Sequence, residues 1–329
     1  MECVTRRKAP NTLVRIHGIE YEVLTQLSLP NRGRWKVKGD RPPPDGTLYT
    51  VIDVVDSPAA IQFIGSLARL PKNSSGIPRL VDFNQVDGRL RMVVTWCEGI
   101  DLDSYFKRVD RNKSFQPTVW ESIRRIRSLA HLCGVLHRDC RIIHGDIKPA
   151  NLVLPKDRGQ IAIIDFGSSW QIEKTRGREH GDGADRHYSA SEVFQQAAIV
   201  DDRADQFSIV VVLFRMLVGE LPYGGIGGQA GDPNYRDRFA KGVETPSKKS
   251  VELQTLPDSI RDEIDALLQR ALSLNPDNRF PSSRAFSNAI DSIYNKMKRA
   301  GSTKPSDKKN RDQKQPNALI ELLKKIWGK

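Results

Sequence analysis

The pattern of apolar and polar positions along this 329-residue chain predicts both strands and helices. Apolar runs at 48–54 and 91–95 predict buried strands, the second of which ends in a turn. Between residues 120 and 137 apolar side chains recur at helical spacing, as in a helix that faces a core: Ile123, Ile126, Leu129 and Leu132. The run 209–214 is interrupted by Arg215 and is far shorter than the roughly 20 residues of a membrane span, so we expect a buried core helix there.

Side chains with chemical function stand between two further apolar runs. A loop carries Asp146, Lys148 and Asn151, an apolar strand follows, and the run 161–164 ends on Asp165. We therefore expect the side-chain oxygen atoms of Asp146, Asn151 and Asp165 to lie at adjacent strand ends. Hard oxygen ligands suit Mg²⁺, which indicates Asn151 and Asp165 as metal ligands. Asp146 could then accept a proton from a hydroxyl, and Lys148 could neutralise charge on the phosphoryl being moved.

These residues resemble the catalytic loop and the D-F-G motif of the eukaryotic-type protein kinases. Three further stretches resemble landmarks of that family, in the family's order: residues 188–192, where Ser191 replaces the usual Pro of A-P-E, the stretch from Asp205 to Phe214, and residues 274–280. The resemblance implies that Asp205 binds the backbone of the catalytic loop and that Arg279 pairs with Glu192.

The resemblance also implies the fold and the reaction. We expect an α+β, two-lobed fold over residues 18–296, with a small antiparallel β lobe (about 18–95) and a larger, mainly helical lobe (about 99–296). ATP and Mg²⁺ would be the cofactors, and a hydroxyl of a protein substrate would be the acceptor. Lys148 is the residue that serine/threonine kinases carry at this place, so a serine/threonine kinase is the predicted activity.

Nucleotide contacts follow from the same family pattern. Val94 takes the gatekeeper position, and Thr95 to Cys97 would offer backbone groups to adenine. Asp101 stands where an acidic residue commonly binds the ribose, and Val153 is assigned to the nucleotide site on the same basis.

The phosphate-binding loop departs from the family. Of three expected glycines only Gly33 is present, Asp53 falls where the third strand normally carries a lysine, and the helix predicted at about 57–70 contains no acidic partner. A carboxylate at that position would repel phosphate. Lys36 occupies the place of the third glycine, where the with-no-lysine kinases carry their substitute lysine, and Lys38 points to the same side of the strand. We favour Lys36 for the phosphate contact; the alternative is that both lysines are simply solvated.

These departures leave two other functions open. An inactive domain that binds ATP or acts as a scaffold would explain the altered phosphate loop. A small-molecule phosphotransferase would explain Gly145, because His-Gly-Asp is common in such enzymes. Gly145 also removes the arginine that, in the family, binds a phosphate on the activation loop. Asp185 stands where serine/threonine kinases keep a threonine that binds the base.

The net charge of +12 is concentrated at the C-terminal end. From residue 296 to 329 nine Lys and two Arg face three acidic residues, a net charge of +8, which argues against a nucleic-acid-binding face. We expect residues 1–17 to be an N-terminal extension and 297–317 a disordered basic linker. Residues 318–329 form a predicted amphipathic helix with one apolar face: Leu319, Leu322, Leu323 and Ile326.

That helix suits an anionic membrane surface, a groove on a partner protein, or the kinase domain itself. Four cysteines without C-x-x-C spacing and the lack of a signal-peptide pattern predict a cytoplasmic protein, with peripheral membrane attachment through the tail as an option. The glycine-rich insert 224–231 predicts a mobile loop.

Overall fold

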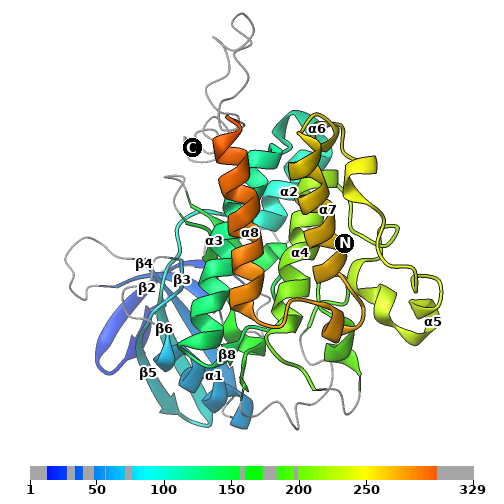
Figure 1. Ribbon diagram of the computed structural model, residues 1–329. Coiled ribbons are helices and arrows are strands. Elements are labelled where there is room, and N and C mark those ends of the chain that lie inside the picture. Colours follow the sequence, from blue (N-terminus) through cyan, green and yellow to red (C-terminus); the bar gives the residue numbers. More distant parts are fainter. Residues whose placement is uncertain are drawn as a thin grey trace, which may run out of the picture. The chain divides into compact units, whose positions relative to one another are not determined.

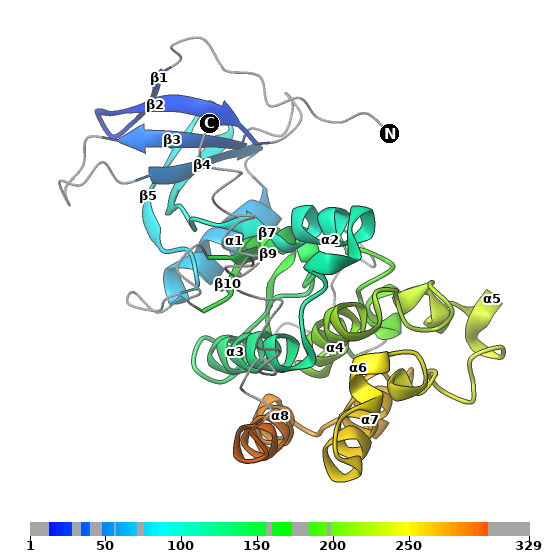
Figure 2. The same ribbon diagram turned by 90° about the horizontal axis from the view of Figure 1, so that it is seen from above.

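The computed structural model describes residues 13–27, 34–39, 48–55, 57–70, 76–155, 160–172, 184–195 and 199–301. They divide into two compact units: the β unit, which ends at Glu98, and the helical unit, which begins at Gly99. Figures 1 and 2 show the elements from two directions. Gly33 and the amphipathic helix predicted at 318–329 lie outside these residues, as does the predicted linker beyond residue 301.

An antiparallel sheet is the main feature of the β unit, and its strands β1 to β4 lie side by side in Figure 2. In the described residues its order is β1-β2-β3-β4-β6-β5. The strands are β1 (Leu13–Ile16), β2 (Ile19–Gln26), β3 (Arg34–Gly39), β4 (Leu48–Val55), β5 (Leu80–Val86) and β6 (Arg89–Thr95). Helix α1 (Pro58–Arg69) begins after Ser57, whose hydroxyl accepts a hydrogen bond from Ala60 N at 3.2 Å. Strand β1 lies inside the predicted N-terminal extension.

Both faces of the central strands are buried, which explains their nearly continuous apolar sequence. Tyr49 and Val51 of β4 pack with Val37 and Val93 in one cluster. Ile52 and Met92 are buried on the opposite face, because successive side chains of a strand point to opposite sides.

The helical unit contains the elements that follow Gly99. Its helices are α2 (Leu102–Arg111), α3 (Val119–Arg138), α4 (Arg203–Val218), α5 (Pro233–Arg236), α6 (Val251–Gln254), α7 (Asp258–Ala271) and α8 (Ser283–Arg299). Short strands complete it: β7 (Ile100–Asp101), β8 (Ile142–Ile143), β9 (Leu152–Leu154), β10 (Ala162–Ile163) and β11 (Trp170–Gln171).

Helices α3 and α4 form the core of this unit. α3 begins with a reciprocal pair of hydrogen bonds between Thr118 and Glu121, a capping box. Its predicted apolar positions are buried, and α8 lies alongside it (Figure 1). α4, the predicted core helix, is buried along most of its length and ends at Gly219 with a φ of +86°. No helix in the described part of the chain is both long and apolar enough to cross a bilayer.

The second half of the glycine-rich insert is packed, so the prediction of a mobile loop is wrong for that half, whereas Gly224 and Gly225 are exposed. Residues Gly227–Gly231 form a 3₁₀ turn whose glycines are buried against residues 187–191. A Cβ atom on Gly228 would lie 2.1 Å from the carbonyl oxygen of Ser189. The composition indicated freedom of the backbone, whereas the three glycines of this turn are needed because neighbouring segments approach it closely.

Candidate active site

The loop between β8 and β9 collects the predicted catalytic residues around one carboxylate. The Lys148 Nζ atom lies 2.8 Å from Asp146 Oδ2, and Asn151 Nδ2 donates to the same oxygen at 2.9 Å and to the Asp146 carbonyl at 2.8 Å. The backbone N–H of Asp185 donates to Asp146 Oδ1 at 3.3 Å. Asp185 thus contacts the carboxylate through its backbone, where the family pattern has a threonine side chain.

The two predicted metal ligands lie at the same end of a hairpin. Strands β9 and β10 pair antiparallel with Leu152 opposite Ile163, so Asn151 and Asp165 flank the same end. The amide nitrogen of Asn151 is engaged with Asp146, which leaves its oxygen for a cation. Asp165 has a left-handed backbone, with φ of +65°. In the described residues no group of three or more His, Cys, Asp or Glu could hold a metal alone. An amide oxygen and one carboxylate therefore fit Mg²⁺, which completes its shell with water and phosphate.

Burial sets the acid–base behaviour of Asp146. The residue is 5% exposed, and this burial raises the pKa of its carboxyl above the ordinary value. The hydrogen bond and positive charge of Lys148 oppose the shift, while the negative charge of Asp165 adds to it. A raised pKa makes Asp146 a better proton acceptor than an ordinary aspartate, as a general base requires.

The backbone of this loop is anchored to α4, as the family resemblance predicted. Asp205 accepts hydrogen bonds from His144 N and Gly145 N, both at 2.9 Å. The Nε2 atom of His137 in α3 lies 2.7 Å from the same carboxylate. Complete burial opposes ionisation, but these partners hold the pKa of Asp205 below its ordinary value. The anchor is therefore a buried carboxylate stabilised by several donors.

Trp170 is a site residue that sequence reasoning missed. It lies on β11 opposite Ile143 of β8 and is 3% exposed. Gly145 has a φ of +73°, and a Cβ atom there would lie 1.9 Å from the Trp170 ring. The ring therefore packs on the position that carries arginine in the family. Only a non-local contact reveals this, because nothing in the local sequence links residues 145 and 170.

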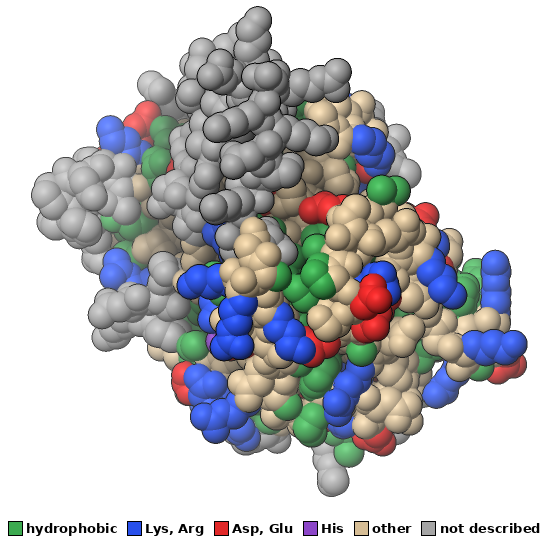
Figure 3. All heavy atoms as spheres, turned by 45° about the horizontal axis from the view of Figure 1, so that its top comes forward, with side chains coloured by type: hydrophobic (Ala, Val, Ile, Leu, Met, Phe, Trp, Pro, Cys, Tyr) green, Lys and Arg blue, Asp and Glu red, His purple; other side chains and the backbone are tan. Residues whose placement is uncertain are grey.

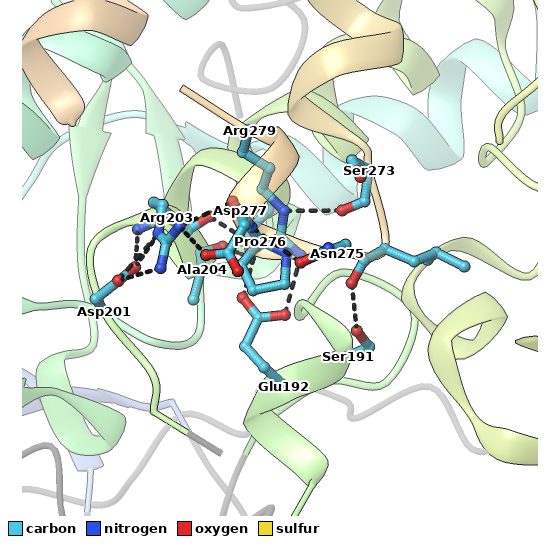
Figure 4. Close-up of polar contacts among 12 residues, drawn as sticks. Ser191, Glu192, Asp201, Arg203, Ala204, Ser273, Asn275, Pro276, Asp277 and Arg279 are labelled. Atoms are coloured by element: carbon cyan, nitrogen blue, oxygen red, sulfur yellow. Dashed lines mark hydrogen bonds and ion pairs between the residues drawn. The ribbon is translucent and has the colours of Figure 1, made fainter. Parts of the chain in front are cut away.

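A buried ion pair fixes the segment that follows Asp185. Figure 4 shows the fork of Arg279 facing the Glu192 carboxylate, at 2.5 and 2.9 Å. Arg279 is 1% exposed and also donates to the carbonyls of Ser273 and Arg203. The predicted pairing of Arg279 with Glu192 is confirmed.

In the β unit, Lys36 and Lys38 differ in their surroundings. Lys36 Nζ lies 4.4 Å from the centre of the Trp96 ring and 3.8 Å from Glu98 Oε2, and its side chain is 23% exposed. Lys38 is exposed. Both residues project from the same face of β3. Lys36 is therefore a partly buried cation that contacts Trp96 and Glu98, whereas Lys38 is exposed to solvent.

Asp53 does not lie on the face of these lysines, and the structure corrects this part of the sequence analysis. Lys36 pairs with Thr50 and Arg34 with Ile52, so Ile52 shares the lysine face while Asp53 projects from the opposite one. There Asp53 binds Arg89 Nε at 2.6 Å and Arg91 Nε at 2.9 Å. Its charge is paired with two arginines on the face opposite Lys36, which removes the basis for the predicted repulsion of phosphate. Ile52, which lies on the same face of the sheet as Lys36, is apolar.

The remaining predicted nucleotide residues have structural partners of their own. Thr95 pairs with Arg79 through its backbone N and its hydroxyl, both at 2.9 Å. Burial raises the pKa of the Cys97 thiol to about 11. Asp101 caps α2 by accepting from Ser104 N at 2.7 Å, and Val153 is buried in β9 opposite it. Contacts of these four residues with nucleotide stay predictions.

Comparison with known proteins gives consistent matches. Residues 59–326 match the family described as "Protein kinase domain". The serine/threonine-protein kinase PksC of Streptomyces coelicolor is 28% identical over 59% of this chain and 33% of its own length. The dual specificity protein kinase TTK of Mus musculus is 25% identical over 65% of this chain and 26% of its own length. The serine/threonine-protein kinase PknI of Mycobacterium tuberculosis is 28% identical over 64% of this chain and 30% of its own length.

The chain thus matches a quarter to a third of the length of these curated relatives. A crystal structure of the M. tuberculosis PknI kinase domain, determined on a point mutant, superposes with a TM-score of 0.57 at 22% identity, covering 83% of this chain and 95% of that one. This likeness shows the fold, which is the α+β fold expected from the sequence.

Proposed function

Because this chain belongs to the protein kinase domain family, we propose that it transfers the γ-phosphoryl group of ATP to a serine or threonine hydroxyl of a protein substrate. The relatives named above are protein kinases, which supports a protein over a small molecule as the acceptor.

One observation carries the proposal: the closed set of contacts around Asp146. A buried carboxylate with a raised pKa, a lysine 2.8 Å away and an asparagine on the same oxygen form a site that can accept a proton beside a stabilised negative charge. Turn residues that merely connected two strands would not need two polar side chains around one oxygen of a buried carboxylate.

The residues then have distinct roles in the proposal. Asp146 accepts the hydroxyl proton, and Lys148 stabilises charge on the phosphoryl oxygens. Asn151 and Asp165 supply the ligands for Mg²⁺, which when bound neutralises phosphate charge. Asp205 keeps the loop backbone in place through His144 and Gly145.

The test combines a titration of ATP with and without Mg²⁺ and a phosphorylation assay on a generic protein substrate. Asp146→Asn should abolish transfer and leave nucleotide affinity nearly unchanged, because the amide cannot accept the proton. Asp165→Ala should instead weaken Mg²⁺-dependent binding. Equal turnover in wild type and Asp146→Asn would remove Asp146 from the mechanism.

A second candidate is an ATP-binding or scaffolding domain without turnover. Ile52 favours it, because this apolar residue stands on the lysine face of the sheet and provides no charge for phosphate. Lys36 is the alternative source of that charge. Lys36→Ala should raise the KM for ATP or lower kcat, with Lys38→Ala as the matched control of equal charge. ATP binding without any turnover in the wild-type protein would favour the scaffold.

A further inference from the structure

A pocket of about 310 Å³ lies in the helical unit beside the segment that follows Asp185. One wall comes from that segment, with Arg186, Ser191 and Phe194. The other wall comes from the glycine-rich turn and α5, with Gln229, Asp232 and Tyr235.

Both walls are fixed in place. Gly228 N donates to the carbonyl of His187 at 2.7 Å, and a Cβ atom on Gly231 would lie 1.9 Å from Ser191 Cβ. The buried pair of Glu192 and Arg279 holds the far end of the segment (Figure 4). The backbone on both sides of the pocket is therefore held in place by hydrogen bonds and close packing.

The pocket is also tied to the candidate base. Asp185, the residue before Arg186, donates its backbone N–H to Asp146 Oδ1 at 3.3 Å. Its side chain accepts from His187 N at 2.9 Å, which fixes the turn that carries Arg186. A substrate whose hydroxyl meets Asp146 can therefore extend toward this pocket.

Arg186 gives the pocket its chemistry. Its side chain is 69% exposed, and its Nη1 atom lies 3.9 Å from Asp232 Oδ2, a long contact for an ion pair. The other oxygen of Asp232 already accepts from Asn234 N at 3.0 Å and Asn234 Nδ2 at 2.8 Å. A guanidinium has five N–H donors in a fork that matches a carboxylate, so Arg186 keeps the capacity to bind one.

We propose that this pocket receives an acidic side chain, Asp or Glu, of the protein substrate, with Arg186 as the specificity-determining residue. The inference rests on the proposed kinase function and specifies its substrate class. Figure 3 shows Lys and Arg side chains in several separate groups over the visible face, with Asp and Glu side chains among them. Two exposed arginines, Arg236 and Arg238, follow the pocket along the chain, with the exposed Asp237 between them.

The test uses peptides with one serine and a single Glu, Gln or Lys placed in turn at each position on either side. At one position Glu should raise kcat/KM by about tenfold over Gln, mainly through KM, because the contact is remote from the reacting atoms. Arg186→Ala should erase the preference, so that the Glu and Gln peptides give the same kcat/KM, and Arg186→Glu should shift the preference to Lys. Arg238 is exposed and does not line the pocket, so Arg238→Ala should show the same preference as wild type.

Peptide affinity, measured by fluorescence anisotropy in the same variants, distinguishes a failure of the proposed kinase function from a failure of the pocket assignment. Glu-dependent binding that needs Arg186, without any turnover, would refute the proposed kinase function and leave the pocket assignment standing. A Glu preference that survives in Arg186→Ala, or no preference for Glu at any position in wild type, would overturn the pocket assignment.

Discussion

At the scale of single residues, the chemistry of this protein depends on how Asp146 is surrounded. Burial raises the pKa of its carboxyl, and Lys148 lowers it through a hydrogen bond and its charge. In the proposed mechanism the same lysine stabilises the transferred phosphoryl group. The basicity of Asp146 and this charge stabilisation would then be coupled through one ammonium group 2.8 Å from the carboxylate.

This coupling predicts a pH effect. Lys148→Ala removes the influence that lowers the pKa of Asp146, so the acid limb of the pH–rate profile should move to higher pH. The value of kcat should also fall by about a hundredfold, because a group that stabilises transition-state charge is lost. Lys148→Arg keeps the charge and should leave the acid limb close to that of wild type. An acid limb at the same pH in Lys148→Ala would show that Asp146 is not the group that titrates.

At the scale of elements, the loop that carries Asp146 is held from two sides. Asp205 of α4 binds its backbone, and Trp170 of β11 packs on Gly145. Strand β11 is in turn fixed to β8 by the pairing of Trp170 with Ile143. The position of the base therefore depends on contacts from α4 and β11 as well as on its own loop.

Gly145→Ala should displace this loop. The added methyl group would collide with the Trp170 ring, and the positive φ is strained for alanine. We expect kcat to fall by about a hundredfold, the effect of a shift of about 1 Å at a catalytic group. The double variant Gly145→Ala/Trp170→Ala should recover part of that loss, because the ring is gone.

The control is Gly134→Ala in α3, where a Cβ atom would meet no atom nearer than 3.9 Å. This variant should keep the kcat of wild type and should not lower the Tm, because Ala is more favourable than Gly inside a helix. Unchanged kcat and Tm in Gly145→Ala would contradict the packing argument.

The ion pair of Glu192 with Arg279 joins two distant segments of the helical unit. Arg279→Ala leaves a buried carboxylate without its partner and should lower the free energy of unfolding by roughly 3–5 kcal/mol. Arg261→Ala removes an exposed pair with Asp258 and should change it by less than about 1 kcal/mol. Urea denaturation measures both, and equal losses would show that the buried pair contributes no more than an exposed one.

At the scale of the whole molecule, the C-terminal tail remains a sequence-based prediction, since residues 302–329 lie outside the described part of the chain. A helix of about 12 residues is marginal alone in water and should form only against an apolar surface. Nearby basic side chains should each add up to roughly 1 kcal/mol on an anionic membrane, and salt should weaken this.

Co-sedimentation with vesicles checks the membrane hypothesis. Full-length protein should bind anionic vesicles at low salt more than a version that ends at Asn317, and neither should bind neutral vesicles well. Equal binding of the two versions to anionic vesicles would leave a partner protein or the kinase domain as the docking site.

The sequence by itself determined the family, the catalytic loop and the two buried anchors. Asp146, Lys148, Asn151 and Asp165 are close in the chain, so one loop and one hairpin bring them near one another. Asp205 and the Glu192–Arg279 pair were predictable because the family places them at recognisable motifs.

Only the tertiary structure decided the face of Asp53, the partner of Gly145 and the packing of the glycine-rich turn. Side chains of a strand alternate with a period of two, so an error of one residue in aligning β4 moves a carboxylate to the other face of the sheet. The strand pairing places Ile52 on the lysine face and Asp53 beside two arginines. Trp170 and the walls of the pocket beside Arg186 lie far from their partners in sequence, and packing between distant segments leaves no local pattern that could be recognised.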